Sequence, residues 1–176
     1  MPSQLTGASI PSCAVLLAVI SDTHMPRGER RLPLACVRVL KQADLILHAG
    51  DLFALSVLRE LELHAPVAAV HGNVDQPGVR ALLPEARVVQ ADGARIAMVH
   101  DGGTREGRLD RLRKRFPGAD AVVFGHSHVP EHRTGPDGFQ VFNPGSPTER
   151  RRAPQHTMGI ARARDGAVAF ELIALD

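Results

Sequence analysis

Short apolar runs recur along the chain, and each ends abruptly in polar sequence that contains Asp, His, Asn or Gly. Runs of this length that are rich in Val, Ile, Leu and Ala are typical of buried strands, and the Gly and Asn residues after them mark turns. The runs cover residues 14–20, 45–49, 67–70, 96–99, 121–124 and 139–142. The pattern therefore predicts a sheet protein whose strands are largely buried.

Helical periodicity separates some of these runs. Apolar residues recur at near-helical spacing over 32–42, 54–63 and 105–116, and Thr104 is a candidate N-cap for the last helix. Hairpins are expected over 87–99 and over 156–175, where an Asp-Gly pair is a turn signal. Strands first alternate with helices and later follow one another. This order predicts a mixed sheet, or two sheets packed together, with helices outside.

Composition narrows the class of protein. The 176 residues suit a single domain over 1–176, with about 1–12 as a flexible tail. The chain has 3% aromatic residues, with no Trp or Tyr, which argues against binding by base stacking. A formal net charge of +2 argues against a protein that coats DNA, so a nucleic-acid polymer is not the expected substrate.

The sequence also bears on where the protein is found. The apolar run that follows Cys13 is far shorter than the ~20 residues that a membrane span needs, and no basic residue precedes it. Cys13 and Cys36 lack the spacing of a redox or zinc motif and are expected to be reduced thiols. We therefore expect a cytoplasmic protein without membrane attachment.

The polar ends of the apolar runs carry the candidate chemistry. In open α/β sheets, ligands bind beyond the carboxyl ends of the strands, so these side chains are expected to converge. The converging set is Asp22, His24, Asp51, Asn73, His100, His126 and His128. It offers carboxylate, amide and imidazole donors without a thiolate, which suits Mn, Fe, Zn, Ni or Co. Residues i and i+2 of an extended segment point the same way, so Asp22 and His24 can address one ion.

These motifs, in this order, resemble those of the calcineurin-like metallophosphoesterase superfamily. They are most similar to its small single-domain bacterial and archaeal phosphodiesterase branch, which is related to the retromer scaffold subunit. The motifs are Asp22-Thr23-His24, Gly50-Asp51, Gly72-Asn73, His100 and Gly125-His126-Ser127-His128, within about residues 19–146. The resemblance implies a four-layer α/β/β/α sandwich, with two mixed β-sheets flanked by helices. Residues 143–146, Asn-Pro-Gly-Ser, also look like a late turn of this branch, beside the site.

The resemblance further implies two divalent metal ions, with manganese preferred over Ni, Fe, Co or Zn. It assigns Asp22, His24 and His128 to one ion. It assigns Asn73, His100 and His126 to the other ion, with Asp51 as the bridge. The implied activity is hydrolysis of a small phosphate ester by a hydroxide that bridges the two ions. Asp51, Asn73 and His100 would act in catalysis through that hydroxide and the bound phosphate.

Two positions depart from the family pattern. Many relatives carry His directly after the Asn, as an acid for the leaving group, but this chain has Val74 there. Without a clear acid, acidic leaving groups are favoured, and a phosphodiesterase is expected rather than a phosphomonoesterase. Asp101 stands where the family usually has Gly, and it is interpreted as a surface turn residue.

Further residues are candidates for supporting roles. His48 could orient a ligand, although a satisfied core residue is the favoured interpretation, and Asp75 could orient a ligand or form a turn. Arg150 and Arg151, together with Asn73, could contact a substrate phosphate, or the two arginines could lie on a loop surface. The basic residues of 105–116 are expected on a solvated face.

Other classes of function remain open. The main alternative is a protein-interaction scaffold of the same fold with weak or no catalysis, which an exposed apolar patch would favour. A nucleic-acid processing enzyme of the superfamily is disfavoured, because those enzymes usually bring extra domains. A homo-oligomer is compatible with any of these functions.

Overall fold

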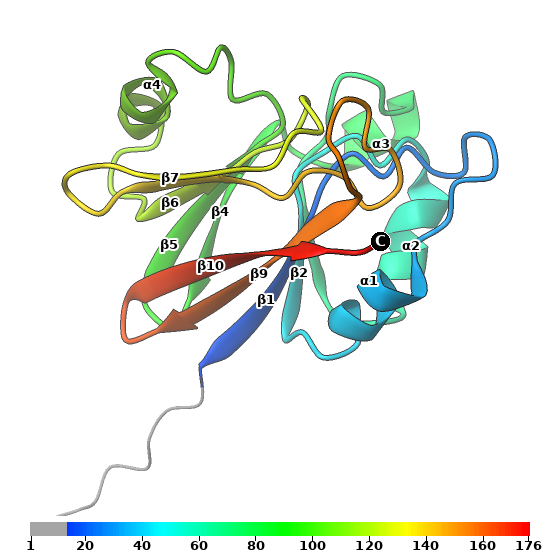
Figure 1. Cartoon of the computed structure of the whole chain (residues 1–176), viewed down its shortest axis with the longest axis horizontal. Coiled ribbons are helices and arrows are strands. Elements are labelled where there is room, and N and C mark those ends of the chain that lie inside the picture. Colours follow the sequence, from blue (N-terminus) through cyan, green and yellow to red (C-terminus); the bar gives the residue numbers. More distant parts are fainter. Residues whose placement is uncertain (1–13) are drawn as a thin grey trace, which may run out of the picture.

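Two five-stranded β-sheets pack face to face in the computed structural model, which describes residues 14–176 (Figure 1). The strands are β1 (Val15–Ile20), β2 (Leu45–His48), β3 (Val67–Ala69), β4 (Ala86–Ala91), β5 (Ala94–Val99), β6 (Ala121–Val123), β7 (Glu131–Thr134), β8 (Gln140–Asn143), β9 (Thr157–Arg164) and β10 (Ala167–Ala174). The first sheet has the order β10-β9-β1-β2-β3 and the second has the order β4-β5-β6-β8-β7. The predicted tail over 1–12 and Cys13 lie outside the described residues.

Both sheets are mixed, and each has a parallel centre. Strands β1, β2 and β3 are parallel to one another, as are β5, β6 and β8. Strands β9, β10, β4 and β7 run antiparallel to their neighbours. Parallel strands have their carboxyl ends at the same edge of a sheet, so the loops that follow them lie together.

Helices cover the outer face of each sheet. They are α1 (Leu34–Leu40), α2 (Leu55–Glu62), α3 (Pro77–Leu82) and α4 (Arg108–Arg115). Helices α1 and α2 lie against the first sheet, and α4 lies against the second (Figure 1). This arrangement is a four-layer α/β/β/α sandwich, which confirms the expected fold. Within the described part of the chain, no helix is long and apolar enough to cross a membrane.

The alternation of side chains along β1 shows why the layers form. Leu17 and Val19 are fully buried between the two sheets, in one core cluster with Met98 and Phe142. Ala18 and Ile20 belong to a second cluster with side chains of α1 and α2. Because successive residues of a strand point to opposite faces, a strand with two apolar faces needs a covering layer on each side.

The structure differs from the predicted elements in three places. Helix α3 and strand β7 were not predicted, because α3 buries only Val79 and β7 contains no apolar residue. Thr104 does not cap α4, which begins at Arg108 after Gly107. The backbone of Gly107 has a φ of 64°, a conformation that glycine adopts without steric cost, and this residue turns the chain into the helix instead.

Candidate metal centre

The seven predicted donor residues all lie on loops that follow the parallel strands. Asp22 and His24 follow β1, Asp51 follows β2, and Asn73 follows β3. The remaining three are on the second sheet, where His100 follows β5 and both His126 and His128 follow β6. The backbone N–H of His126 donates to the Asp22 carboxylate at 3.0 Å, which joins the loops of the two sheets. The structure therefore brings all seven side chains to one edge of the sandwich.

One buried group consists of Asp22, His24 and His128. The Nε2 atoms of His24 and His128 are 3.1 Å apart, and Asp22 Oδ1 lies 3.4 Å from His128 Nε2. Asp22 Oδ1 is also 3.9 Å from His24 Nε2. Three ligand atoms of different side chains thus surround one small volume that is closed to solvent.

A second buried group consists of Asp22, Asp51 and His100. His100 Nε2 lies 3.2 Å from Asp51 Oδ2 and 3.2 Å from Asn73 Oδ1. His126 Nδ1 reaches the same Asn73 oxygen at 3.0 Å. Asp22 belongs to both groups, and Asp51 Oδ2 is also 3.8 Å from His24 Nε2. Both carboxylates therefore lie between the two groups, whereas the sequence indicated only Asp51.

The hydrogen bonds behind two of the rings leave their Nε2 atoms free for a cation. His100 Nδ1 donates to the carbonyl of Ala49 at 2.8 Å, and His128 Nδ1 donates to the carbonyl of Glu149. In a neutral ring, a donating Nδ1 leaves the Nε2 lone pair directed at the centre. That lone pair meets other acceptors, namely carboxylate oxygens and a second ring nitrogen. A cluster of converging acceptors fits a divalent cation.

Burial and charge shift the protonation of these groups in opposite directions. Burial raises the pKa of Asp22 to about 7 and lowers the pKa of His128 to about 4. Burial also acts to lower the pKa of His100, but Asp51 and Asp22 outweigh it and raise that pKa to about 9. Burial acts to raise the pKa of Asp51, but the hydrogen bond and charge of His100 outweigh it and lower that pKa to about 2. Protons thus occupy the positions that a cation would take.

Five of the seven donor residues have left-handed backbone. The φ angles are 57° at Asp22, 47° at His24, 59° at Asp51, 70° at His126 and 60° at His128. This region is uncommon for residues with a side chain and costs on the order of 1–3 kcal/mol each. Strain of this kind gathers at functional sites, where the surrounding structure holds the backbone in place.

Asp75 holds the loops of the first sheet from behind. Its buried carboxylate accepts hydrogen bonds from the backbone N–H groups of Asp51 at 3.1 Å, Gly72 at 2.7 Å and Phe53 at 2.5 Å. These three residues lie on the loops that carry Asp51 and Asn73. Of the two roles that the sequence allowed, the contacts favour orientation of the ligand loops.

The turn over residues 143–146 ties β1 to the late part of the chain. Ser146 Oγ donates to the carbonyl of Asp22 at 2.8 Å, and Thr148 Oγ1 donates to the carbonyl of Thr23 at 2.7 Å. Asn143 Nδ2 donates to the carbonyl of Gly125 at 2.9 Å. One turn therefore fixes the loops that carry His24 and His126, from opposite sheets.

Two glycines allow the loops to approach each other this closely. A Cβ atom on Gly72 would overlap the carboxylate of Asp51, and one on Gly125 would overlap Ser21 Oγ. Any side chain at either position would displace a loop of the centre. The Gly-Asn and Gly-His pairs of the sequence are thus required by packing around the ligands.

The other candidate residues are placed differently. His48 is fully buried, and its Nε2 lies 3.1 Å from Thr23 Oγ1. Thr23 is the residue between Asp22 and His24 in the sequence. Arg151 Nη1 donates to the carbonyl of His126 at 3.3 Å. Arg150 instead bonds to carbonyls of its own loop, at Ala153 and Pro154.

Glu149 is a residue that no motif indicated. Its carbonyl orients His128, and its carboxylate Oε2 lies 3.6 Å from His24 Nε2. The other carboxylate oxygen pairs with Arg30 Nη2 at 3.0 Å. Glu149 lies three residues beyond the Asn-Pro-Gly-Ser turn and is not part of any motif, so the sequence carried no signal for it.

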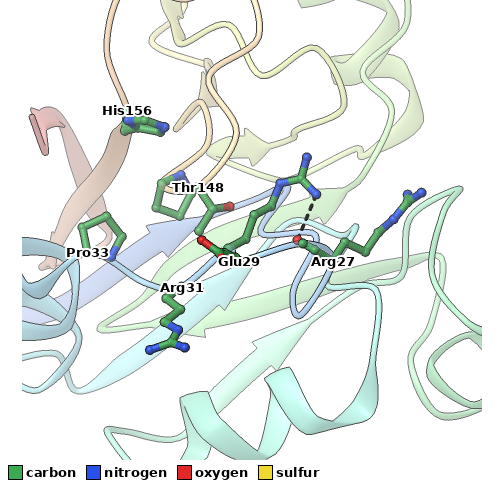
Figure 2. Close-up of a pocket in the computed structure, with 9 residues that line it drawn as sticks. Arg27, Glu29, Arg31, Pro33, Thr148 and His156 are labelled. Atoms are coloured by element: carbon green, nitrogen blue, oxygen red, sulfur yellow. Dashed lines mark hydrogen bonds between the residues drawn. The ribbon is translucent and has the colours of Figure 1, made fainter.

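Two cavities flank the centre. One, of about 270 Å³, is lined in part by Asn73, His100 and His126. The other, of about 540 Å³, lies between residues 27–33 and the 147–156 loop and is drawn in Figure 2. Only the first includes donors of the centre, so it is the one that opens directly onto the candidate cations.

The chain is similar to known phosphoesterases in sequence and fold. The model of the calcineurin-like phosphoesterase superfamily domain matches residues 15–166. A probable metallophosphoesterase of Methanothermobacter thermautotrophicus is 38% identical over 140 residues, which are 78% of this chain and 80% of the relative. A solved Thermotoga maritima protein is 32% identical with a TM-score of 0.72, over 92% of this chain and 99% of that chain. Vacuolar Protein Sorting 29 from Cryptosporidium parvum shares the fold. It is 22% identical, and the TM-score is 0.74 over 92% of this chain and 98% of that chain.

Proposed function

This chain belongs to the calcineurin-like phosphoesterase superfamily, in its branch of small proteins, and we propose that it hydrolyses small phosphodiesters with two divalent cations. The family makes it a metal-dependent phosphoesterase. The observation that carries the finer proposal is the convergence of acceptor atoms from both sheets on one buried centre. The cytoplasmic location expected from the sequence belongs to the same proposal, and cell fractionation tests it.

Each of the two groups of donor residues is assigned to one proposed cation. Asp22, His24 and His128 would hold one cation. His100, Asn73 and His126 would hold the other, and Asp51 would lie between them. Such cations neutralise charge on phosphate oxygens and lower the pKa of water. Manganese is the proposed metal, because it accepts mixed carboxylate, amide and imidazole ligands.

Residues around the centre would position the substrate and restrict which leaving groups it can have. Asn73 and His126 are exposed, so they face the substrate, whereas Asp22 and His128 are buried and hold fixed positions. Val74 donates its backbone N–H to Asp51 Oδ1 at 3.0 Å, and its side chain has no proton to give to a leaving group. Esters whose leaving groups are acidic therefore suit this centre. Arg151 lies beside the His126 loop and is the proposed phosphate contact of the arginine pair.

A metal-by-substrate matrix tests the proposal. The purified protein is assayed on chromogenic monoesters and diesters and on cyclic nucleotides, with Mn, Ni, Co, Zn or Mg. We expect turnover to need added metal and to be faster on aryl diesters. Asp51→Ala and His128→Ala should each lower turnover by at least about 10²-fold, because each removes a ligand of the centre. His64→Ala, at the end of α2, is the matched control and should keep wild-type rates. Activity that survives in Asp51→Ala would contradict the assignment.

A protein-interaction scaffold of the same fold is the second candidate, and such a protein would use exposed apolar side chains to bind its partner. Leu34 is 76% exposed and Leu63 is 82% exposed, and both lie at ends of the helices that cover the first sheet. Rates of zero across the whole matrix, from a protein that still binds manganese, would favour the scaffold.

A further inference from the structure

The cleft that opens onto the metal centre has a charged wall of its own. We call it the Arg80 cleft, and its volume is about 270 Å³. Besides Asn73, His100 and His126 of the centre, charged and polar side chains line it: His71, Arg80, Glu85, Asp101 and Arg115. A phosphate held at the centre would therefore direct one of its ester groups into this cleft.

Of the four Arg, Asp and Glu side chains that line the Arg80 cleft, two form an ion pair with each other. Arg115 Nη2 pairs with Glu85 Oε1 at 2.8 Å. Asp101 Oδ1 accepts the backbone N–H of Gly103 at 2.7 Å, so this carboxylate is engaged by its own loop. Arg80, on α3, has no carboxylate within 4.0 Å among residues 14–176. The cleft thus presents one guanidinium whose charge is left for a ligand.

The size and lining of the cleft restrict what can enter. No Phe lines it, and the chain has no Trp or Tyr, so a nucleobase would find only small imidazole rings there, two of which belong to the proposed cation ligands His100 and His126. A volume of about 270 Å³ is at the low end for ligand pockets, which suits a short aliphatic group. The complementary ligand is a compact group with a negative charge at its far end.

The larger cavity lacks these features. Figure 2 shows the guanidinium groups of Arg27 and Arg31 pointing in different directions rather than toward a common point. Arg27 lies over the ring of Phe53, and Arg30 is held by Glu149 and by the carbonyl of Arg27. His156 pairs with Asp176. Arg27, Arg30 and His156 thus already have protein partners, and no donor residue of the centre lines this cavity, so the Arg80 cleft is the better candidate.

We propose that the Arg80 cleft binds one ester group of the substrate and that Arg80 selects a compact aliphatic group bearing a second anionic end, such as a carboxylate. The inference rests on the proposed function, because the metal centre must hold the phosphate. A guanidinium binds a carboxylate through two parallel N–H···O bonds, which gives both affinity and orientation. Arg80 is thereby a specificity residue and takes no part in the bond-breaking step.

Binding of phosphonates that cannot be hydrolysed tests this role without relying on turnover. Calorimetry on the manganese-loaded protein compares 3-phosphonopropionate with propylphosphonate and 4-phosphonobutyrate with butylphosphonate. Each pair shares a chain length and differs only in its carboxylate end. We expect the better carboxylate probe to bind roughly 10-fold more tightly than its alkyl partner, as one charge-assisted contact provides. Arg80→Gln should remove that advantage and leave the alkyl phosphonates unchanged within about twofold.

Arg87→Gln is the matched control. Arg87 is an exposed arginine of β4 outside the cleft lining, and its variant should keep the carboxylate preference. Equal affinities within both pairs in the wild type, or a preference that survives Arg80→Gln, would overturn the inference alone. Carboxylate preference in a protein that hydrolyses no diester would overturn the proposed function alone. If no phosphonate binds, both are overturned.

Discussion

Single residues outside the donor set determine the geometry of the centre. Asp75 is the clearest case, because one buried carboxylate accepts three backbone N–H groups from two ligand loops. The left-handed backbone at Asp22, Asp51 and His128 needs such support, since each residue would relax if its loop were released. The affinity of the centre for cations therefore depends on hydrogen-bond acceptors that do not contact a cation themselves.

Replacing Asp75 with Asn tests this dependence. The amide keeps the shape but turns one acceptor into a donor, which would face a backbone N–H. We expect a loss of about 2–4 kcal/mol in the free energy of unfolding and a roughly 10–100-fold weaker affinity for manganese. Urea unfolding and metal titration measure the two effects. Asp120→Asn is the control, because exposed Asp120 also accepts a backbone N–H, from Arg95 at 2.7 Å, and precedes β6, whereas donor residues follow it. Similar losses in both variants would contradict the argument.

Some residue roles could be predicted from sequence and others could not. The seven donors follow apolar runs in motifs, so their convergence was predictable and the structure shows it. Glu149 acts through a carbonyl on a late loop, and only the folded chain brings it to His128. For Ser146 the sequence indicated a place beside the site, but not the bond from its hydroxyl to the carbonyl of Asp22. The position of Asp22 in both donor groups also depends on three-dimensional distances.

At the scale of elements, strands with apolar runs were predictable, and elements that bury few apolar side chains were not. Strand β7 is an edge strand without apolar residues, and α3 is a helix of only 6 residues with one buried side chain. Helix α4 was predicted as an element, but the expectation of a solvated basic face was wrong for Arg108. That side chain is buried, pairs with Glu131 on β7 and lies over the ring of Phe124.

Arg108 is therefore expected to attach α4 to the second sheet. Arg108→Met leaves the Glu131 carboxylate with Arg133 as its remaining partner, and it removes the bond to the carbonyl of Gly103. We expect a loss of about 2–4 kcal/mol in the free energy of unfolding, because a buried pair loses one member. Lys114→Met on the exposed face of the same helix should change it by less than about 0.5 kcal/mol. Equal effects in chemical denaturation would refute the attachment.

At the scale of the molecule, the candidate centre joins the two sheets. Four proposed ligands come from the first sheet and three from the second, so bound cations would cross-link the layers. The sandwich itself was predictable through the family resemblance. The distribution of charge around the centre, including the guanidinium of Arg80 that is unpaired among the described residues, could not be predicted. It depends on which side chains pair with one another in the folded chain.

The affinity for manganese should rise with pH. A cation needs Asp22 ionised and the Nε2 of His100 unprotonated, and these groups have pKa values of about 7 and about 9. Between pH 7 and pH 9 only His100 must lose a proton, so affinity should increase by about 10-fold per pH unit. Below pH 7 both protons must leave, and the dependence should be steeper. Chelator competition across pH 6–9 measures the slope, and an affinity independent of pH would contradict this account.

The pairing of β1 with β9 has a consequence for the order of synthesis on the ribosome. β1 emerges early, yet one of its two neighbours in the sheet is β9, which is translated more than a hundred residues later. Until then β1 has one unsatisfied edge, and the Ser146 and Thr148 contacts to the Asp22 loop are also missing. The nascent chain therefore cannot complete the centre, and until β9 is made the open edge of β1 is available for pairing with other chains.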